Sequence, residues 1–210
     1  METPNVALLS VYHKSQAFAD FAQFLTEQDL VLWGSSGTTK FLEEQGIHCT
    51  DVATIVGDPI LDHRVVTLSR EVHAGLLARL DEPEDRAVLA RIGIAPIGLV
   101  YVSMYPLEDE LFNLARTAAS LRKQIDIGGP TMLRSAAKGD RIVVSAEDQF
   151  EEVKELLRLS WDSASAKLLR LQLAREAEHR VARYAGLASD AYDFLYTMEL
   201  EAMKKAAGNT

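Results

Sequence analysis

A run of small polar residues, "GSSGTT" at residues 34–39, lies between an apolar segment and a segment with helical character. Small residues let backbone N–H groups approach a ligand closely, and the positive end of the following helix attracts anions. The hydroxyl groups add further hydrogen-bond donors. We therefore expect a phosphate-binding turn in which the contacting residues are Ser35, Ser36, Gly37 and Thr38. A strand–helix turn with ordinary capping residues would explain the same pattern.

Two further polar residues, Ser10 and Lys14, belong to or follow the first apolar run of the chain, "NVALLSVY" at residues 5–12. If the two apolar runs form adjacent parallel strands, both carboxyl ends lie at one edge of the sheet, which is where open α/β sheets bind ligands. Lys14 would then share an anion with the turn at 34–39. The alternative is a solvated lysine at the start of a helix.

The segment "LDHRVVTLSREVHAG", residues 61–75, offers Arg64, Thr67 and Arg70 as anion contacts. The alternative is an edge strand with surface arginines. Tyr105 ends the most apolar run of the chain, "PIGLVYVSMYP". A tyrosine at this place either stacks on a base and donates a proton, or packs as an aromatic residue at the rim of the sheet.

The segment "IDIGGPTMLRSAAK", residues 125–138, combines an acid, a Gly-Gly-Pro turn and a predicted helix. The backbone N–H groups of Gly128 and Gly129 are suited to an oxyanion or a carbonyl oxygen. Asp126 precedes the turn and Lys138 ends the helix. In the alternative interpretation Asp126 caps the helix and Lys138 complements its dipole.

The elements that must position these groups alternate between strand and helix. The first half of the chain has apolar strand patterns and helical patterns in turn, with Phe18, Phe21 and Leu25 at helical spacing. This order predicts right-handed βαβ units and a parallel sheet, hence an α/β fold. The expected strands are 5–12, 30–34, 47–55, 96–106 and 141–146, and the expected helices after residue 38 are 39–46, 71–80, 85–93, 107–123 and 130–139.

From residue 147 onward strand patterns disappear. Apolar residues from Leu168 to Tyr184 recur every three or four positions, and a further helix is expected at 189–205. The predicted organisation is an α/β ligand-binding domain at 1–150 and a helical C-terminal extension at 151–210. We expect this extension to pack on the domain or on a partner subunit.

The composition narrows the function classes. The 210 residues carry a formal net charge of −9, and 48% are hydrophobic, which is typical of a globular protein. The acidity argues against nucleic-acid binding, although a local cluster of cations still suits a small anion. Cys49 is the only cysteine, so an internal disulfide is excluded. Neither a membrane span nor a signal peptide is evident, and we expect a cytoplasmic protein without a membrane partner.

Five blocks of the chain resemble, in the same order, segments of IMP cyclohydrolase, the N-terminal domain of a bifunctional purine biosynthesis enzyme. They are "ALLSVYHKS", "GSSGTTKFLEEQGI", "ILDHRVVTLSREVHAGLLAR", "GLVYVSMYPLE" and "IDIGGPTMLRSAAKG". The resemblance covers residues 6–150 and continues more loosely through the tail. It implies a methylglyoxal-synthase-like open parallel sheet flanked by helices, a homodimer, and no metal or organic cofactor. The family's transformylase half has no counterpart in the sequence, so a divergent stand-alone cyclohydrolase module is expected.

The resemblance implies a 5-formamidoimidazole-4-carboxamide ribotide as substrate, whose ring closes with loss of water. The implied catalytic residues are Tyr105, Asp126 and Lys138. The implied substrate-binding residues are Ser10, Lys14, Ser15, Ser35, Ser36, Gly37, Thr38, Arg64, Thr67, Ser103, Ile127, Gly128 and Gly129.

The sequence departs from the family pattern at the expected reacting end. The usual Arg-Val-Lys-Thr-Leu-His-Pro block has Val66 in place of the lysine and Ser69 in place of the histidine, and Ser103 replaces an asparagine. Three hypotheses follow. The chain is a ring-closing enzyme, on the usual ribotide or on a relative in a specialised nucleoside or natural-product pathway. Alternatively it binds or senses a purine nucleotide without turnover. The third is a methylglyoxal-synthase-type enzyme, against which the "IDIGGP" block and the helical tail argue.

Overall fold

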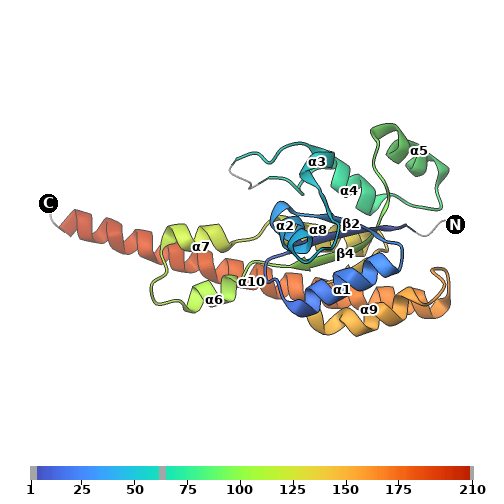
Figure 1. Cartoon of the computed structure of the whole chain (residues 1–210). Coiled ribbons are helices and arrows are strands. Elements are labelled where there is room, and N and C mark those ends of the chain that lie inside the picture. Colours follow the sequence, from blue (N-terminus) through green and yellow to red (C-terminus); the bar gives the residue numbers. More distant parts are fainter. Residues whose placement is uncertain (1–3, 62–64, 209–210) are drawn as a thin grey trace. The chain divides into compact units, whose positions relative to one another are not determined.

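The computed structural model describes residues 4–61 and 65–208 (Figure 1). It divides into two compact units. The sheet unit comprises residues 1–104 and 127–178, and the helical unit comprises residues 105–126 and 179–210. The boundaries of these units differ from the predicted domain boundary at residue 150. Whether the chain folds as two independent parts that meet at residue 150 stays a prediction.

The sheet unit is built on five parallel strands in the order β3-β2-β1-β4-β5. The predicted adjacency of the first two strands is confirmed, since Leu9 of β1 is in register with Gly34 of β2. On the other side of β1, Val11 is in register with Ser103 of β4. The α/β prediction is therefore confirmed. The strands are β1 Val6–Val11, β2 Val31–Gly34, β3 Thr50–Asp51, β4 Ile97–Ser103 and β5 Ile142–Val144.

Helices cover both faces of this sheet (Figure 1). On one face, α1, α9 and the first turns of α10 bury apolar side chains against the strands. On the other face, α4 and α8 pack together and against β4. The bounds are α1 Gln16–Glu27, α2 Ser36–Glu44, α3 Ala53–Val56, α4 Arg70–Leu77, α5 Pro83–Ile92, α8 Gly128–Lys138, η1 Glu147–Gln149 and α9 Phe150–Leu157.

Aromatic side chains fill the centre of the first face. The rings of Phe21 and Phe150 stack with centroids 4.1 Å apart. The ring of Tyr101, from β4, meets the Phe150 ring edge-on at 5.2 Å and lies 5.6 Å from the Phe18 ring. Aromatic pairs at these distances stabilise a core beyond the area that they bury. They tie α1 and α9 to β4, the neighbour of the central strand β1, and so fix the positions of these two helices on the sheet.

The expected strand at 47–55 is wrong for most of its length. Only Thr50 and Asp51 pair with β2, and α3 begins at Ala53. The Asp51 carboxylate accepts a hydrogen bond from the Ala53 amide at 2.9 Å, and the Thr54 hydroxyl donates to the Asp51 carbonyl at 2.7 Å. Such short side-chain bonds favour a turn over a continued strand.

Two predicted helical segments also differ from the structure. Residues 107–123 form α6 Leu107–Phe112 and α7 Ala118–Gln124, because Asn113 makes a turn and Thr117 starts the second helix with a capping box. The two helices expected after residue 164 are instead one 45-residue helix, α10 Ala164–Gly208. The only helix-disfavouring residue in its interior is Gly186, and one glycine destabilises a helix by only about 1 kcal/mol.

Candidate functional site

The carboxyl ends of β1 and β2 are joined through the buried hydroxyl of Thr38. The Val11 amide donates to Thr38 Oγ1 at 3.0 Å, and the Ser35 hydroxyl lies 3.0 Å from the same oxygen. Thr38 is fully buried, so its hydroxyl serves the protein and is not available to a ligand. Its contribution is to hold the first turn of α2 directly beyond the end of β1.

The first turn of α2 lies open to solvent at its outer side. Gly37 is exposed, and Ser35 and Ser36 are half-buried. The helix begins after Ser35 without a side-chain cap, although serine is a favoured capping residue. The N–H groups at the start of a helix carry partial positive charge and bind anions. The turn predicted to bind phosphate therefore has the geometry for it.

Lys14 lies beside this turn. Its ammonium nitrogen donates to the carbonyls of Val11 at 3.0 Å and Tyr12 at 3.3 Å, and it is 3.9 Å from the place where a Cβ atom on Gly37 would be. Partial burial lowers the pKa of the Lys14 ammonium. A bound anion would offset that loss of hydration. We call Lys14 and the first turn of α2 the anion cradle.

Three serines predicted at the site have different surroundings. Ser10 lies half-buried near the end of β1, on the face opposite Leu9 and Val11. Ser15 caps α1, since its hydroxyl accepts from the Phe18 amide at 3.0 Å and donates to Glu147 at 2.6 Å. Ser103 accepts from the Tyr12 and His13 amides, each at 3.2 Å. Ser15 and Ser103 thus position the loop that carries Lys14.

The segment at residues 65–69 is a loop and not an edge strand. Val65 makes a single antiparallel bridge to Ile60, and the Ser69 hydroxyl caps α4 by accepting from the Val72 amide at 3.0 Å. Val66 is half-buried in this loop. Arg70 is exposed and pairs with Glu71 at 3.2 Å, so its charge is already shared. Arg64, predicted as an anion contact, lies outside the described residues.

The loop reaches the first turn of α8 through Thr67. Its hydroxyl oxygen is 3.1 Å from the position that a Cβ atom on Gly128 would occupy, so Gly128 permits the contact. Since α8 connects β4 to β5, its start lies at the carboxyl edge of the sheet, the same edge as the anion cradle. The start of α8, with Ile127, Gly128 and Gly129, thus lies at this edge, and substrate binding by these residues stays a prediction.

Tyr105 and Asp126, two of the predicted catalytic residues, belong to the helical unit. The Asp126 amide donates to the hydroxyl of Tyr184 at 2.9 Å, and that hydroxyl donates to the Gln124 carbonyl at 2.7 Å. The pKa of Tyr184 is raised to about 12, chiefly by burial and also by the charges of Asp126 and Tyr105, although the hydrogen bond from the Asp126 amide lowers it. Tyr184 therefore holds the segment before α8 in place as a neutral group.

Lys138, the third predicted catalytic residue, ends α8 at the opposite edge of the sheet. The eleven residues of α8 put its first and last Cα atoms about 15 Å apart at 1.5 Å per residue. The following Gly139 lies against the Leu76 carbonyl, at the far end of α4. The structure therefore does not bring Lys138 together with the anion cradle or with Gly128. Its catalytic role stays a prediction from the resemblance.

Three residues that support the site were not predicted from the sequence. Glu147 receives the Ser15 hydroxyl, and Tyr184 holds Asp126. His73 of α4 lies 2.9 Å from the Ser135 hydroxyl of α8 through its Nδ1 atom. These contacts join residues at least 58 positions apart, so no local pattern reveals them.

Within residues 4–61 and 65–208 no helix is long and apolar enough to cross a membrane. The same residues contain no group of three or more histidine, cysteine or acidic side chains able to hold a metal ion.

The half-buried His73, whose Nε2 atom is buried, makes the stability of the sheet unit depend on pH. Burial lowers the pKa of folded His73 below the value of about 6.5 expected in the unfolded chain. As pH falls through 6.5 the unfolded chain takes up the proton first, so the free energy of unfolding should decrease, by at most about 1.4 kcal/mol per pH unit. Chemical denaturation between pH 7.5 and 5.5 measures this slope.

The variant His73→Gln should flatten that slope, because it removes the titrating group. His179→Gln, which changes an exposed histidine, is the matched control and should leave the slope unchanged. An equal slope in wild type and His73→Gln would show that His73 is not the group responsible.

Known proteins share this fold and much of this sequence. Residues 17–131 match the model of the MGS-like domain. The bifunctional purine biosynthesis protein PurH of Chelativorans sp. is 40% identical over 181 residues, which are 85% of this chain and 33% of that protein. PurH of Lactiplantibacillus plantarum is 40% identical over 183 residues, 87% of this chain and 36% of that protein. The chain thus spans about a third of the length of the curated relatives it matches.

Among solved structures, the crystal structure of ForH superposes with a TM-score of 0.74 at 28% identity. The match covers 91% of this chain and all of ForH. The resemblance to the bifunctional purine biosynthesis enzyme is confirmed by the PurH relatives. With more than half of its residues matched by the domain model, the chain belongs to the family of MGS-like domains.

Proposed function

We propose that the chain is an IMP cyclohydrolase-like enzyme that closes the second ring of a 5-formamidoimidazole-4-carboxamide ribotide. The observation that carries the proposal is the anion cradle, where Lys14 Nζ lies beside Gly37 at the start of α2. A ribotide has a phosphate that such a cradle binds. The names of the relatives, purine biosynthesis proteins, favour a purine ribotide over other phosphorylated molecules.

In the proposed complex the phosphate lies against Lys14 and the N–H groups of Ser36 and Gly37, while Ser35 and Ser10 line the approach. Arg64 and Thr67 belong to the same set through the resemblance. The heterocycle then extends along the carboxyl edge toward the first turn of α8. Through the resemblance, Ile127, Gly128 and Gly129 bind the carbonyl end of the substrate there.

The proposed reaction needs no second substrate. The carboxamide nitrogen attacks the formyl carbon and forms the new C–N bond, while its proton leaves to a base. This bond completes the ring. The formyl oxygen then takes up two protons and leaves as water, while the formamido nitrogen loses its proton and forms a C=N bond to the former formyl carbon. Because both reacting groups belong to one molecule, holding them in an attacking geometry lowers the barrier substantially. We assign proton transfer to Asp126 and Tyr105.

No step is assigned to Lys138, because it ends α8 at the amino edge of the sheet. The role that the resemblance gives to this lysine would require a path of about 15 Å from Gly128. The proton transfers are assigned to Tyr105 and Asp126 through the resemblance.

Val66 favours a second candidate function, nucleotide binding without turnover. The family pattern has a lysine here, and an apolar side chain neither transfers a proton nor stabilises developing negative charge. A protein that keeps the anion cradle and lacks this lysine would bind or sense a purine nucleotide without turning it over. The proposal thus separates binding, supported by the cradle, from turnover.

Binding is tested with Lys14→Ala. Removing a charged hydrogen-bond donor should weaken binding of inosine 5′-monophosphate about tenfold to hundredfold, since such a bond contributes about 1.5–3 kcal/mol. Titration calorimetry measures the affinity. Lys40→Ala, which removes an exposed cation of the same helix, is the control and should change the affinity little. Inosine, which lacks the phosphate, should bind both variants alike; an equal loss for inosine would contradict the assignment.

Turnover is tested by following purine absorbance from the formylated carboxamide ribotide. We expect the wild type to exceed the uncatalysed rate and Tyr105→Phe to lower kcat. Val66→Lys should raise kcat by about tenfold or more if the missing cation limits the reaction. Val66→Met, which restores length without charge, is its control. Tight ribotide binding with no turnover in the wild type would refute the enzyme and support the nucleotide-binding function.

We also propose a homodimer, formed in the cytoplasm through the helical unit. This unit exposes large apolar side chains: Leu114 is 99% exposed, Phe112 77%, Tyr196 70% and Met203 68%. Exposed apolar residues gathered on one unit indicate a protein–protein contact. The resemblance implies pairing of two copies.

Light scattering should give the mass of two chains for the wild type. The double variant Phe112→Glu and Leu114→Glu should shift the mass toward one chain, because buried unpaired carboxylates are costly. Val88→Glu, a change at an exposed apolar residue of α5, should leave the dimer intact. A monomeric wild type at all concentrations would refute the dimer.

A further inference from the structure

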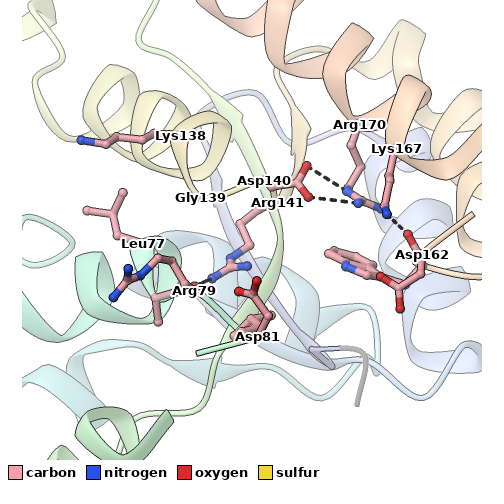
Figure 2. Close-up of a pocket in the computed structure, with 13 residues that line it drawn as sticks. Leu77, Arg79, Asp81, Lys138, Gly139, Asp140, Arg141, Asp162, Lys167 and Arg170 are labelled. Atoms are coloured by element: carbon pink, nitrogen blue, oxygen red, sulfur yellow. Dashed lines mark hydrogen bonds and ion pairs between the residues drawn. The ribbon is translucent and has the colours of Figure 1, made fainter. Parts of the chain in front are cut away.

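A cavity of about 360 Å³ lies at the amino edge of the sheet, at the end of α8 opposite the anion cradle (Figure 2). All of its walls belong to the sheet unit. They are the end of α4 with residues 78–81, the turn at 138–141 before β5, and the start of α10 with Trp161 and Asp162. Its size falls within the range of cavities that bind small metabolites.

On one wall of the cavity the charged groups already have partners within the protein. The guanidinium of the buried Arg170 pairs with Asp140 at 3.0 Å, donates to the Trp161 carbonyl at 2.9 Å and stacks on the Trp161 ring at 4.1 Å. Figure 2 shows these groups on the side of α10. On the opposite side Arg79 pairs with Asp85 at 3.0 Å. The charges of Arg170 and Arg79 are therefore already matched.

Arg141 is different. It is only 3% exposed, and it donates one hydrogen bond, from Nη2 to the Ala78 carbonyl. Its buried Nε atom has no hydrogen-bond partner among the described residues, and no carboxylate of that part of the chain pairs with it. In Figure 2 its guanidinium lies between Arg79 and Asp81, at the wall of the cavity. The nearby charge of Asp140 favours the charged guanidinium but is paired with Arg170, and a buried charge that lacks its own paired carboxylate is costly.

The charged residues that are not paired within the described part of the chain determine the net charge of the cavity. The exposed Lys138 and Lys167 are among the lining residues, together with Asp81 and Asp162. In Figure 2 the Lys138 side chain points away from Arg141. With Arg141 this leaves three cations against two acids, in a chain whose formal net charge is −9. Burial lowers the pKa of Arg141 to about 10, so its guanidinium keeps its proton at neutral pH. A local excess of positive charge around a buried guanidinium is the arrangement that favours an anion.

We infer that this cavity binds a small phosphorylated metabolite, with the phosphate on the Arg141 guanidinium and with the exposed Lys167 adding to the positive charge of the cavity. A phosphate oxygen accepts from the free Nε–H and from a neighbouring Nη–H, which is the fork geometry of arginine. The volume beyond the phosphate accommodates a body of the size of a small sugar. This site lies at the opposite edge of the sheet from the anion cradle and does not depend on the proposed ring closure.

The test uses inorganic phosphate as the probe and the full chain as it exists. The variant Lys14→Gln first weakens the anion cradle, so that binding at the cavity dominates. In this background we expect one phosphate site by equilibrium dialysis at low ionic strength. The ¹⁵Nε resonance of Arg141, assigned by its loss in Arg141→Met, should shift as phosphate is added. Binding detected by dialysis without a shift of this resonance would overturn the inference, as would no binding at all.

Two variants in the same background separate the cavity from general charge effects. Arg141→Met should weaken phosphate binding by about tenfold or more, the effect of losing a charged donor pair. Lys167→Glu, at an exposed residue that does not affect the core, should weaken it by about threefold to tenfold. Arg91→Glu reverses an exposed cation of α5 as the matched control. An equal effect of Lys167→Glu and Arg91→Glu would show unspecific attraction and overturn the inference.

Discussion

The hydrogen bond from the Val11 amide to the buried Thr38 hydroxyl is the constraint on which the candidate site depends. It joins the end of the central strand β1 to the first turn of α2, and it leaves no room for Thr38 to face a ligand. Because this hydroxyl is satisfied within the protein, we infer that the N–H groups of Ser36 and Gly37, at the start of α2, would hold a ligand at this turn. The loop that carries Lys14 is then held against them by Ser15 and Ser103. In the proposed site, Thr38, Ser15 and Ser103 thus support the groups that would hold the anion.

The same constraint explains what could be predicted from the sequence. The strands β1 and β2, the turn at 34–39 and Lys14 follow from local patterns, and parallel pairing alone brings them to one edge. The sequence pattern does not show which hydroxyls are used internally. Ser69 illustrates this, since a serine in place of a family histidine is a helix cap in the structure. The role of Tyr184 was also out of reach, because its partners precede it by about sixty residues.

Lys138 and Arg141 show that a sequence resemblance does not give the positions of side chains in space. A rise of 1.5 Å per residue along the predicted helix is by itself enough to separate Lys138 from Gly128. Arg141 is the opposite case, because in the sequence it is an ordinary polar residue before a short strand. Its importance comes only from burial without a carboxylate partner among the described residues. To assign a role to a charged side chain near a helix end, one must therefore know both its position along the helix axis and its counter-ions.

Binding and turnover make different demands on this fold. The anion cradle uses backbone N–H groups and one lysine, and such groups tolerate many changes of neighbouring side chains. Acid–base catalysis requires ionisable groups within hydrogen-bond reach of the reacting atoms. Val66 removes one such group from the loop beside Thr67, whereas the contact of Thr67 with Gly128 is retained. An intramolecular ring closure is the kind of reaction that survives this loss best, because orientation of the two reacting groups supplies much of its acceleration once the phosphate is held.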